Sequence, residues 1–277
     1  MFTANTRARG RGGTDFDVHY AVTWGQDHIL KLNQGKEVQL SMDQSSGSGF
    51  ESKSHYGSGF FQMRINCLQE IPPALSQLST YLTSKDNTHD EVDFEFLGNR
   101  QGKPTAIQTN VFTNGQGGRE QKFVLWFDPT TSFHTYGILW NPYHIVFYVD
   151  KVPIRVFKNN KRSGVNYPSK PMQLEASLWN GEAWATNGGK DKINWAYAPF
   201  KAQFQGFSDH GCHVNGQSNI ANVCGSTRYW WNTGTYSRLS ANEQKAMENV
   251  RAKYMNYDYC SDRPRYPVPP SECQWNM

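Results

Sequence analysis

Three acidic side chains alternate with apolar ones in the segment HDEVDFEFLGN, which spans residues 89–99. Glu91, Asp93 and Glu95 occupy every second position. Because successive side chains of a β-strand point to opposite faces, this spacing predicts a strand with three carboxyl groups on one face. Acidic residues form strands poorly, and like charges that share a face repel one another. The pattern therefore indicates that the carboxyl groups act together on something bound across that face.

Clustered carboxyl groups that act without a metal are typical of glycoside hydrolysis and glycosyl transfer. One ionised carboxylate attacks the anomeric carbon, and one protonated carboxyl group donates a proton to the departing oxygen. Crowding is expected to raise the pKa of one acid above the others, so that like groups take opposite roles at one pH.

The distance between Glu91 and Glu95 tests this interpretation. Retaining enzymes hold their two carboxyl groups about 5–5.5 Å apart, whereas the Cα atoms of positions i and i+4 on a flat strand lie about 13 Å apart. A concave strand, with both long side chains leaning inward, is expected to close the gap. The shorter Asp93 suits a hydrogen-bonding and electrostatic part between them.

Two other interpretations of the acidic strand compete. The acids could bind calcium, but no loop of the EF-hand kind accompanies them, and strand alternation does not suit such a loop. They could also form an ordinary solvated strand face, and this alternative stays open. We expect no metal and no cofactor at this site.

Short apolar and aromatic segments separated by turn residues predict strands along most of the chain. They are EVQLSM (37–42), FFQMRI (60–65), FVLWF (123–127), YGILW (136–140), HIVFYV (144–149) and IRVFK (154–158). Strands that follow one another without helices predict an all-β fold of antiparallel sheets, and a long carbohydrate groove favours a curved jelly-roll sandwich. One helix is predicted near the C-terminus, where Ser240 and Glu243 match a capping box and Met247, Val250 and Tyr254 share a helical face.

Composition excludes several function classes. The chain has 277 residues, no internal repeat and 14% aromatic residues, which suit both sugar faces and sandwich cores. No apolar segment approaches the roughly 20 residues of a membrane span. The net charge of +4 is too small and too dispersed to predict a nucleic-acid partner. The basic cluster at residues 7–11 belongs to a leader that we expect to be disordered.

Cysteine usage favours an oxidising compartment. Cys212, Cys224, Cys260 and Cys273 lie in the C-terminal third, and Cys67 is the fifth. Their spacing allows several pairings, but disulfides persist in extracellular space, and no close-spaced zinc-ligand quartet is present. The leader MFTANTRARGRGG has no apolar signal core. We expect a mature, engineered or truncated form, so the missing signal does not indicate the cytosol.

The segment DEVDFEF resembles the active-site strand of plant xyloglucan endotransglucosylase/hydrolases, members of glycoside hydrolase family sixteen, whose pattern is D-E-I/V-D-F-E-F. The resemblance extends from about Val18 onward through residues 107–121, 125–140, 145–159, 177–190 and 257–273. It implies a concanavalin A-like jelly roll over residues 18–205, preceded by a leader over 1–17. A C-terminal extension over 206–277 would carry the helix and two disulfides, Cys212–Cys224 and Cys260–Cys273.

The resemblance also implies roles for individual residues. Glu91 would be the nucleophile, Glu95 the general acid/base, and Asp93 the helper between them. Further substrate-binding residues are implied along the groove: Tyr81, Asn110 and Trp179 on the donor side, Arg119, Trp184, Gly189 and Arg263 nearer the acceptor side or shaping the groove, and His89.

The implied activity is that of a secreted, monomeric cell-wall transglucosylase with a polysaccharide donor and a saccharide acceptor. The segment SLWNGEAWATNGGKDKINW (177–195) is short, as in the transferases, which favours transfer over hydrolysis. The sequence Gly117-Gly118-Arg119, where many members have Gly-Asp-Arg, could shift acceptor preference towards mixed-linkage glucan or cellulose. An endohydrolase and a non-catalytic β-glucan-binding module remain alternatives, since curved sandwiches also host binding modules.

One segment departs from the family. Between Met63 and Tyr81, members carry a pattern such as K-L-P-x-x-x-S-A-G-V-V-T-A-F, whereas this chain has NCLQEIPPALSQLST. The replacement supplies Cys67 and the pair Pro72-Pro73, which cannot both sit in a central strand. Dropping two bases from a back-translation restores Leu-Pro-Ser-Arg-Asn-Ser-Ala-Gly-Val-Val-Thr-Ala-Phe. We therefore hypothesise a compensated pair of frame shifts across 66–80, with an adaptive loop as the alternative. A frame shift present in the protein is expected to damage a core strand beside the acidic strand.

Overall fold

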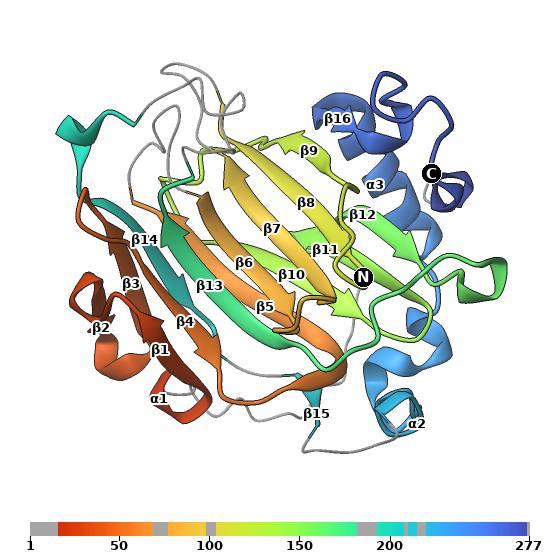
Figure 1. Ribbon diagram of the computed structural model, residues 1–277, viewed down its shortest axis with the longest axis horizontal. Helices are drawn as coiled ribbons and strands as arrows, with labels where there is room; N and C mark the ends of the chain where they lie inside the picture. The colour runs from red at the N-terminus through yellow and green to blue at the C-terminus, as the bar shows by residue number, and fades with distance from the viewer. Residues whose placement is uncertain are drawn as a thin grey trace.

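Two antiparallel sheets pack face to face in the computed structural model, which describes residues 16–68, 77–97, 104–181, 193–207, 210–214 and 220–275 (Figure 1). The sheet that carries the acidic strand is called the groove sheet. It has the order β1-β4-β13-β6-β7-β8-β9-β16. Its strands are β1 (Tyr20–Trp24), β4 (Ser48–Ser52), β13 (Gln173–Trp179), β6 (Gln77–Thr83), β7 (Glu91–Leu97), β8 (Ala106–Phe112), β9 (Gln121–Val124) and β16 (Met255–Asp258).

The second sheet, called the back sheet, has the order β12-β11-β10-β5-β14-β3-β2, with β15 paired to β5. Its strands are β12 (Val152–Lys158), β11 (His144–Val149), β10 (His134–Trp140), β5 (Tyr56–Cys67), β14 (Phe200–Gln205), β3 (Glu37–Met42), β2 (Ile29–Leu32) and β15 (Gly211–His213). Both sheets are antiparallel throughout the described chain. The predicted all-β sandwich is confirmed.

The few helices lie outside the sandwich. Three are α-helical, namely α1 (Phe16–His19), α2 (Ile220–Cys224) and α3 (Ala241–Tyr254). Short 3-10 turns are described at Gln26–His28, Asn33–Gly35, Lys161–Ser163, Trp195–Tyr197, Trp230–Asn232, Gly234–Tyr236, Tyr259–Ser261 and Ser271–Gln274. None of the described helices is long and apolar enough to cross a membrane.

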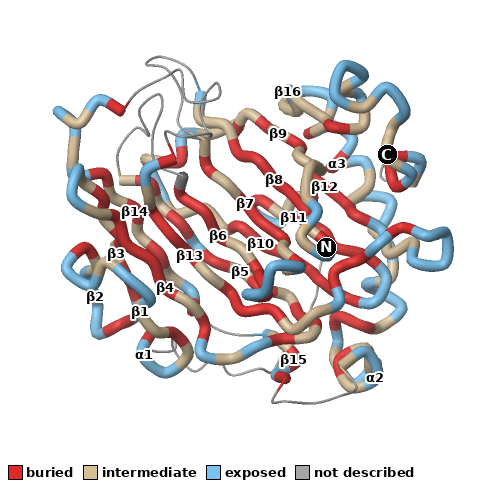
Figure 2. Tube along the Cα trace, viewed as in Figure 1, coloured by how far each residue is buried: buried red, intermediate tan, exposed pale blue. Residues whose placement is uncertain are grey.

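The apolar face of β7 builds the core between the sheets. Val92, Phe94 and Phe96 are fully buried there, and Figure 2 shows buried segments running along the central strands of both sheets. Phe94 meets Phe147 edge-on at 5.2 Å between ring centroids, and Phe96 meets Tyr136 at 4.7 Å. The alternation predicted from the sequence is confirmed, because the acidic residues are thereby left on the outer face of the groove sheet.

The predicted strands match the structure with one notable exception. EVQLSM and HIVFYV coincide with β3 and β11, whereas the strand predicted over residues 123–127 is wrong beyond Val124. There the amide of Leu125 donates to the carbonyl of Thr105, and the ring of Trp126 packs against Tyr254 of α3 at 5.5 Å. Packing against the helix therefore ends a strand that apolar composition alone would extend.

The predicted leader over residues 1–17 reaches too far into the chain. Phe16 is fully buried and contacts the rings of Tyr20, Phe50 and Phe207. A leader that ended at residue 17 would leave this part of the core empty, so the sandwich includes Phe16. The basic cluster at residues 7–11 lies outside the described residues.

β6, which contains the last residues of the unusual 66–80 segment, is an intact strand beside β7. β6 pairs along its full length with β13 and from Leu78 to Thr83 with β7, and Leu78 and Leu82 are buried in the core. The expected damage is therefore absent from residues 77–83. Pro72 and Pro73 lie outside the described residues and outside β6. Cys67, the last residue of β5, is buried opposite Ala202, and burial raises the pKa of its thiol to about 12.

The C-terminal part packs on the sandwich through α3. The capping box is confirmed, because Ser240 accepts from the amide of Glu243 and the Glu243 carboxylate accepts from the amide of Ser240. Met247 packs with Val146 and Val156 on the outer face of the back sheet, while Val250 joins the main core. Disulfides join Cys212 to Cys224 and Cys260 to Cys273.

Candidate active-site groove

The strand β7 lies between β6 and β8, so each of its acids has a fixed neighbour on either side. Antiparallel pairing places the following residues in three rows across the groove sheet: Thr83, Glu91 and Phe112; Tyr81, Asp93 and Asn110; Ser79, Glu95 and Gln108. Cross-strand neighbours on one face lie close enough for their side chains to interact. The fold thereby surrounds each carboxyl group with one defined set of partners.

The three acids line a single cleft of about 350 Å³, within the range of pockets that bind small ligands. The cleft brings together the predicted Tyr81, Trp179 and acids with three residues that sequence reasoning missed: Trp24, Ser79 and Ser177. Ser79 lies opposite Glu95, and Ser177 lies opposite Ser79 on the next strand, which only the strand order reveals. Trp24 comes from β1 near the edge of the sheet, and nothing local in the sequence marks it.

Asp93 is the most deeply buried of the three acids, with only 3% of its surface exposed. Burial raises its pKa well above the ordinary value, and the charges of Glu95 and Glu91 raise it further. A hydrogen bond joins Asp93 to Glu91. This bond lowers the pKa of Glu91 and raises that of Asp93, so within the pair Asp93 is the donor and the carboxylate of Glu91 is the acceptor.

Glu91 and Glu95 have different surroundings. Burial raises the pKa of both, and that of Glu95 reaches about 7. Three neighbours favour the charge on Glu91: the ring of His89, whose Nε2 lies 4.0 Å from Oε2, and the side chains of Thr83 and Asp93. For Glu95 the amide of Gln108 is the main group that favours ionisation. Burial is therefore the first cause of both raised pKa values and crowding is a smaller one, while the neighbours that favour the charge on Glu91 distinguish it from Glu95.

A buried cation lies beneath the acidic strand. Arg155 of β12 is 2% exposed, and its guanidinium donates to the carbonyl and hydroxyl of Thr109 at 2.8 Å and to the carbonyl of Arg119 at 2.7 Å. Its charge also opposes the rise in the pKa of Asp93. Sequence reasoning missed Arg155. The sequence feature that could have revealed it is a single charged residue inside the apolar strand VPIRVFK.

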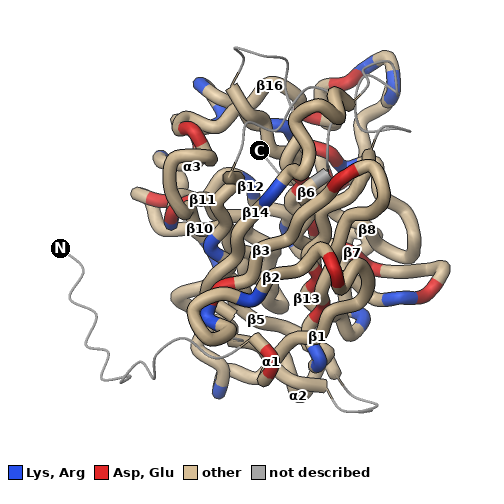
Figure 3. Tube along the Cα trace, turned by 90° about the vertical axis from the view of Figure 1, so that its left-hand side faces the viewer, with Lys and Arg blue, Asp and Glu red and all other residues tan. Residues whose placement is uncertain are grey.

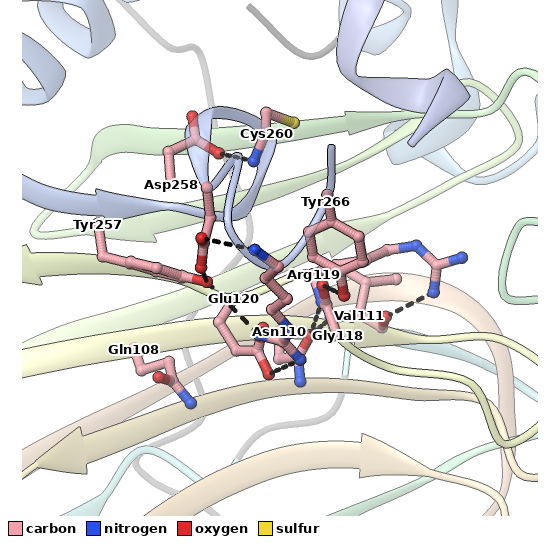
Figure 4. A network of polar contacts seen from close by, with 12 residues as sticks. Gln108, Asn110, Val111, Gly118, Arg119, Glu120, Tyr257, Asp258, Cys260 and Tyr266 are labelled. Carbon is pink, nitrogen blue, oxygen red and sulfur yellow. Dashed lines mark hydrogen bonds and ion pairs between the residues drawn. The ribbon is translucent and has the colours of Figure 1, made fainter. Parts of the chain in front are cut away.

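Asn110 and Arg119 hold the connection between β8 and β9 and do not line the cleft. The Oδ1 atom of Asn110 accepts from the amides of Val111 and Arg119 at 2.9 and 3.0 Å. The guanidinium of Arg119 donates to Oε1 of Glu272 at 2.6 Å and to the carbonyl of Val111. Figure 4 shows Asn110, Val111 and Arg119 together with Tyr266 of the C-terminal segment, whose hydroxyl bonds to Gly118 in this connection. Asn110 lies opposite Asp93, and its Oδ1 atom is used by the backbone of the β8–β9 connection; its donor-side role stays a prediction.

Two of the other predicted groove residues, His89 and Arg263, are among the described residues. His89 borders the site, with its ring 5.2 Å from that of Phe112. Arg263 is exposed in the turn after Cys260, in the segment that contacts the β8–β9 connection. Trp184 and Gly189 lie outside the described residues.

The Gly117-Gly118-Arg119 sequence lies against the C-terminal segment. Gly118 has a φ of +81°, which side chains adopt with strain. Its carbonyl accepts from the hydroxyl of Tyr266 at 2.9 Å, and a Cβ atom would lie 2.5 Å from that hydroxyl oxygen (Figure 4). An Asp at position 118 would therefore require Tyr266 to move. The observed position of Tyr266 thus depends on a glycine at 118.

Charges of both signs are interspersed along the chain (Figure 3). The described residues contain no group of three His, Cys, Asp or Glu side chains suited to a metal ion. Three carboxyl groups converge on the cleft beside Tyr81, and carboxyl groups placed together in this way can transfer protons and act as nucleophiles.

Folding stability should depend on pH through Glu95. The ordinary pKa of 4.5 applies to the unfolded chain and rises to about 7 on folding. The stability associated with the protonated group is thus full below about pH 4.5 and is lost as the pH rises through about 7. We expect Glu95→Gln to be more stable than the wild type at pH 8 by roughly 2–3 kcal/mol, with little difference at pH 4. Urea unfolding at both pH values measures this, and equal differences at the two values would contradict it.

Comparison with known proteins agrees with this geometry. Residues 16–197 match the model of Glycosyl hydrolases family 16, and residues 225–273 match that of the Xyloglucan endo-transglycosylase (XET) C-terminus. Xyloglucan endotransglucosylase/hydrolase protein 2 of Arabidopsis thaliana is 86% identical over 280 residues, covering 100% of this chain and 94% of that protein. A xyloglucan endotransglucosylase/hydrolase of Brassica oleracea var. botrytis is 48% identical and covers 94% of this chain and 87% of its own length.

Solved structures agree on the fold. A Bacillus licheniformis β-glucanase superposes with a TM-score of 0.54 at 23% identity, covering 68% of this chain and 89% of its own. The family match extends over most of the chain, and the relatives match it from end to end. The chain therefore belongs to glycosyl hydrolases family 16 and, within it, to the xyloglucan endotransglucosylase/hydrolases.

Proposed function

We propose that this enzyme is a xyloglucan endotransglucosylase that cleaves a β-1,4-glucan backbone with retention and transfers the cleaved chain to a saccharide acceptor. The observation that carries the proposal is the arrangement of the three acids in one cleft. Asp93 is hydrogen-bonded to Glu91, and the pKa of Glu95 is raised to about 7. A retaining reaction needs one ionised and one protonated carboxyl group on the two sides of the scissile bond.

In the first step Glu91 attacks the anomeric carbon, and Glu95 gives its proton to the departing glycosidic oxygen. The glucan chain then stays bound to Glu91 as an ester, and Glu95 is ionised. As Glu91 loses its negative charge, the hydrogen bond from Asp93 weakens. Asp93 therefore stabilises the Glu91 carboxylate before the attack and again when Glu91 is displaced from the anomeric carbon.

In the second step Glu95 takes the proton of an incoming hydroxyl group, whose oxygen displaces Glu91 from the anomeric carbon. A sugar hydroxyl completes transfer, and water completes hydrolysis. Transfer is favoured when the acceptor binds well and water is held off. The short segment over residues 177–195 supports transfer, and Trp24 and Trp179 offer rings at the cleft for sugar faces.

The enzyme would act in the plant cell wall as a secreted monomer. Two disulfides support an extracellular location. Its partners would be a xyloglucan donor and a xyloglucan or related β-glucan acceptor, with no nucleic acid. The pair formed by Gly118 and Tyr266 lies at the connection after β8, where a difference from other members would affect the acceptor side.

A transfer assay tests the proposal. Purified protein is given xyloglucan and a fluorescently labelled xyloglucan oligosaccharide, and labelled polymer and new reducing ends are measured together. We expect the label to enter polymer without an equal rise in reducing ends. New reducing ends alone would make the protein an endohydrolase, and absence of both signals from folded protein on xyloglucan, mixed-linkage glucan and cellulose would leave only a binding role.

A further inference from the structure

The outer face of the groove sheet carries a second group of charges, which the proposed reaction does not use. Glu175 of β13 is paired with Tyr81 of β6 on one side and with Glu51 of β4 on the other. Tyr81 is paired in turn with Asp93. Because paired residues on neighbouring strands share a face, these side chains form one row that runs from β4 through β13 and β6 to β7 (Figure 1).

The hydroxyl group of Tyr81 is hydrogen-bonded to both Glu175 and Ser177. Burial is the main cause that raises the pKa of Tyr81, and the charge and hydrogen bond of Glu175 raise it further, whereas the bond to Ser177 lowers it. A phenol donates in a bond that raises its pKa and accepts in one that lowers it. Ser177 therefore donates to Tyr81, and the single hydroxyl proton of Tyr81 is donated to Glu175.

Lys85, which follows β6, holds the carboxylate of Glu175 beside Tyr81. The ammonium of Lys85 contacts Oε2 of Glu51 and lies 3.4 Å from Oε1 of Glu175. Only 16% of the Glu175 side chain is exposed, so its neighbours in the sheet also restrict its position. Oε1 of Glu175 makes no hydrogen bond. The oxygen that accepts from Tyr81 is therefore Oε2, while Oε1 faces the cation.

Glu91 is a second acceptor close to the hydroxyl of Tyr81. Both residues line the cleft. Tyr81 lies diagonally across from Glu91, because it is paired with Asp93, two residues further along β7. Diagonal neighbours are about 7–8 Å apart, within reach of aromatic and long side chains. The charge of Glu91 is also among the smaller causes that raise the pKa of Tyr81. Tyr81 thus lies between two carboxyl groups, and its proton is bonded to Glu175.

A hydrogen bond from Tyr81 to Glu91 would slow the attack on the anomeric carbon. The Glu91 carboxylate already has hydrogen bonds with Thr83 and Asp93. A further donor would stabilise the ionised carboxylate before the reaction, and this stabilisation would be lost as the charge leaves the attacking oxygen. Interactions that are stronger in the ground state than in the transition state raise the barrier. The direction in which the Tyr81 hydroxyl points therefore affects the nucleophile.

We propose that Glu175 is a positioning residue, which accepts the hydroxyl proton of Tyr81 and so keeps that hydroxyl from bonding to Glu91. This assignment rests on the proposed function, in which Glu91 is the nucleophile. Without the Glu175 carboxylate the Tyr81 hydroxyl turns to Glu91. Glu175→Ala should therefore lower kcat about 10–100-fold, the effect expected of one hydrogen bond to a charged group. KM should change little, because the ring of Tyr81 still lines the cleft.

A double-mutant cycle with Tyr81→Phe tests this assignment. The four proteins are the wild type, Glu175→Ala, Tyr81→Phe and the combination of the two changes, and kcat and KM are measured for cleavage of a labelled xyloglucan oligosaccharide. We expect Glu175→Ala to lower kcat by less than about threefold when residue 81 is Phe, since no hydroxyl is left to bond to Glu91. An equal loss in both backgrounds would overturn the proposal, because Glu175 would then act without the hydroxyl.

Two further variants separate the hydrogen bond from the charge. Glu175→Gln keeps an oxygen that can accept from Tyr81, and its kcat should stay within about threefold of the wild type. Glu51→Ala is the matched control, since it removes the other carboxylate bound to Lys85, one strand further from Tyr81, and its kcat should equal that of the wild type. A loss in Glu175→Gln or Glu51→Ala as large as in Glu175→Ala would overturn the proposal.

The pKa of Glu91 gives a readout that needs no turnover. The ¹³C signal of its carboxyl group is titrated in the four proteins of the cycle. The groups that act on this carboxyl are His89, Thr83, Asp93, Glu95 and Glu175. Glu175→Ala should lower the pKa of Glu91 further when residue 81 is Tyr than when it is Phe, because only the hydroxyl can donate.

Equal falls in the pKa of Glu91 in the two backgrounds would overturn the proposal. The expected difference, in a protein that cleaves no glucan, would sink the proposed function and leave the role of Glu175 in holding Tyr81 standing.

Discussion

Replacing Glu91 by Ala is expected to lower kcat by roughly 10⁴–10⁶-fold, the range found when a catalytic nucleophile is removed. The bond from the sugar to Glu91 cannot form, and water in its place has neither the position nor the charge of the carboxylate. The hydrogen bond from Asp93 also loses its acceptor. Release of labelled product from a xyloglucan oligosaccharide measures the loss, and the affinity for donor should change little.

The nucleophile role proposed for Glu91 has a specific signature. In the space left by the carboxylate, azide can attack the anomeric carbon while Glu95 protonates the departing oxygen. The product of Glu91→Ala with azide should be a glycosyl azide of inverted configuration. Glu175→Gln is the matched control, since Glu175 faces Tyr81 on the same sheet but is paired with Lys85. A loss below tenfold in Glu91→Ala, or no azide product, would contradict the assignment.

Replacing Arg155 by Met is expected to lower the free energy of unfolding by about 3–5 kcal/mol. Buried ion pairs can often be exchanged for apolar groups when both partners are replaced together. Here the guanidinium donates hydrogen bonds to the backbone carbonyls of Thr109 and Arg119. No side-chain substitution removes those carbonyls. Both carbonyls would be left buried without these donors, and the pKa of Asp93 would rise further as the nearby positive charge disappears.

Urea unfolding near pH 6 measures this loss. Arg228→Met is the control, because Arg228 is exposed and its guanidinium lies over the ring of Tyr229 and donates to that residue's hydroxyl at the surface, and such surface changes alter stability by less than about 0.5 kcal/mol. A loss below about 1 kcal/mol in Arg155→Met would show that the carbonyls find other donors. Activity of the folded fraction should fall as well, since Arg155 connects β12 to β8 and to the connection that follows it.

Much of the fold could be predicted because strand alternation and helix capping are local. Seven residues of β7 are enough to assign Glu91, Asp93 and Glu95 to one face and three apolar residues to the other. The capping box of α3 spans four residues. Where the local pattern continued past the real end of β9, it failed, because Trp126 packs against a helix far along the chain.

The position of Phe16 could not be read from its neighbourhood for the same reason. It follows a basic, glycine-rich leader, yet its ring is enclosed by residues from β1, β4 and the segment after β14. For Asn110 the local pattern predicted the position but not the hydrogen bonding. Its place on the sheet beside Asp93 is as alternation suggests, but its amide oxygen is taken by the backbone of Arg119.

The sequence by itself determined the chemistry, since the types and spacing of the acids belong to one strand. Only the tertiary structure decided which acid holds its proton, because burial and the neighbours Gln108, Thr83 and Arg155 come from other strands. Alternation along a strand follows from backbone geometry, whereas desolvation and cross-strand contacts depend on which distant segments the packed sandwich brings together.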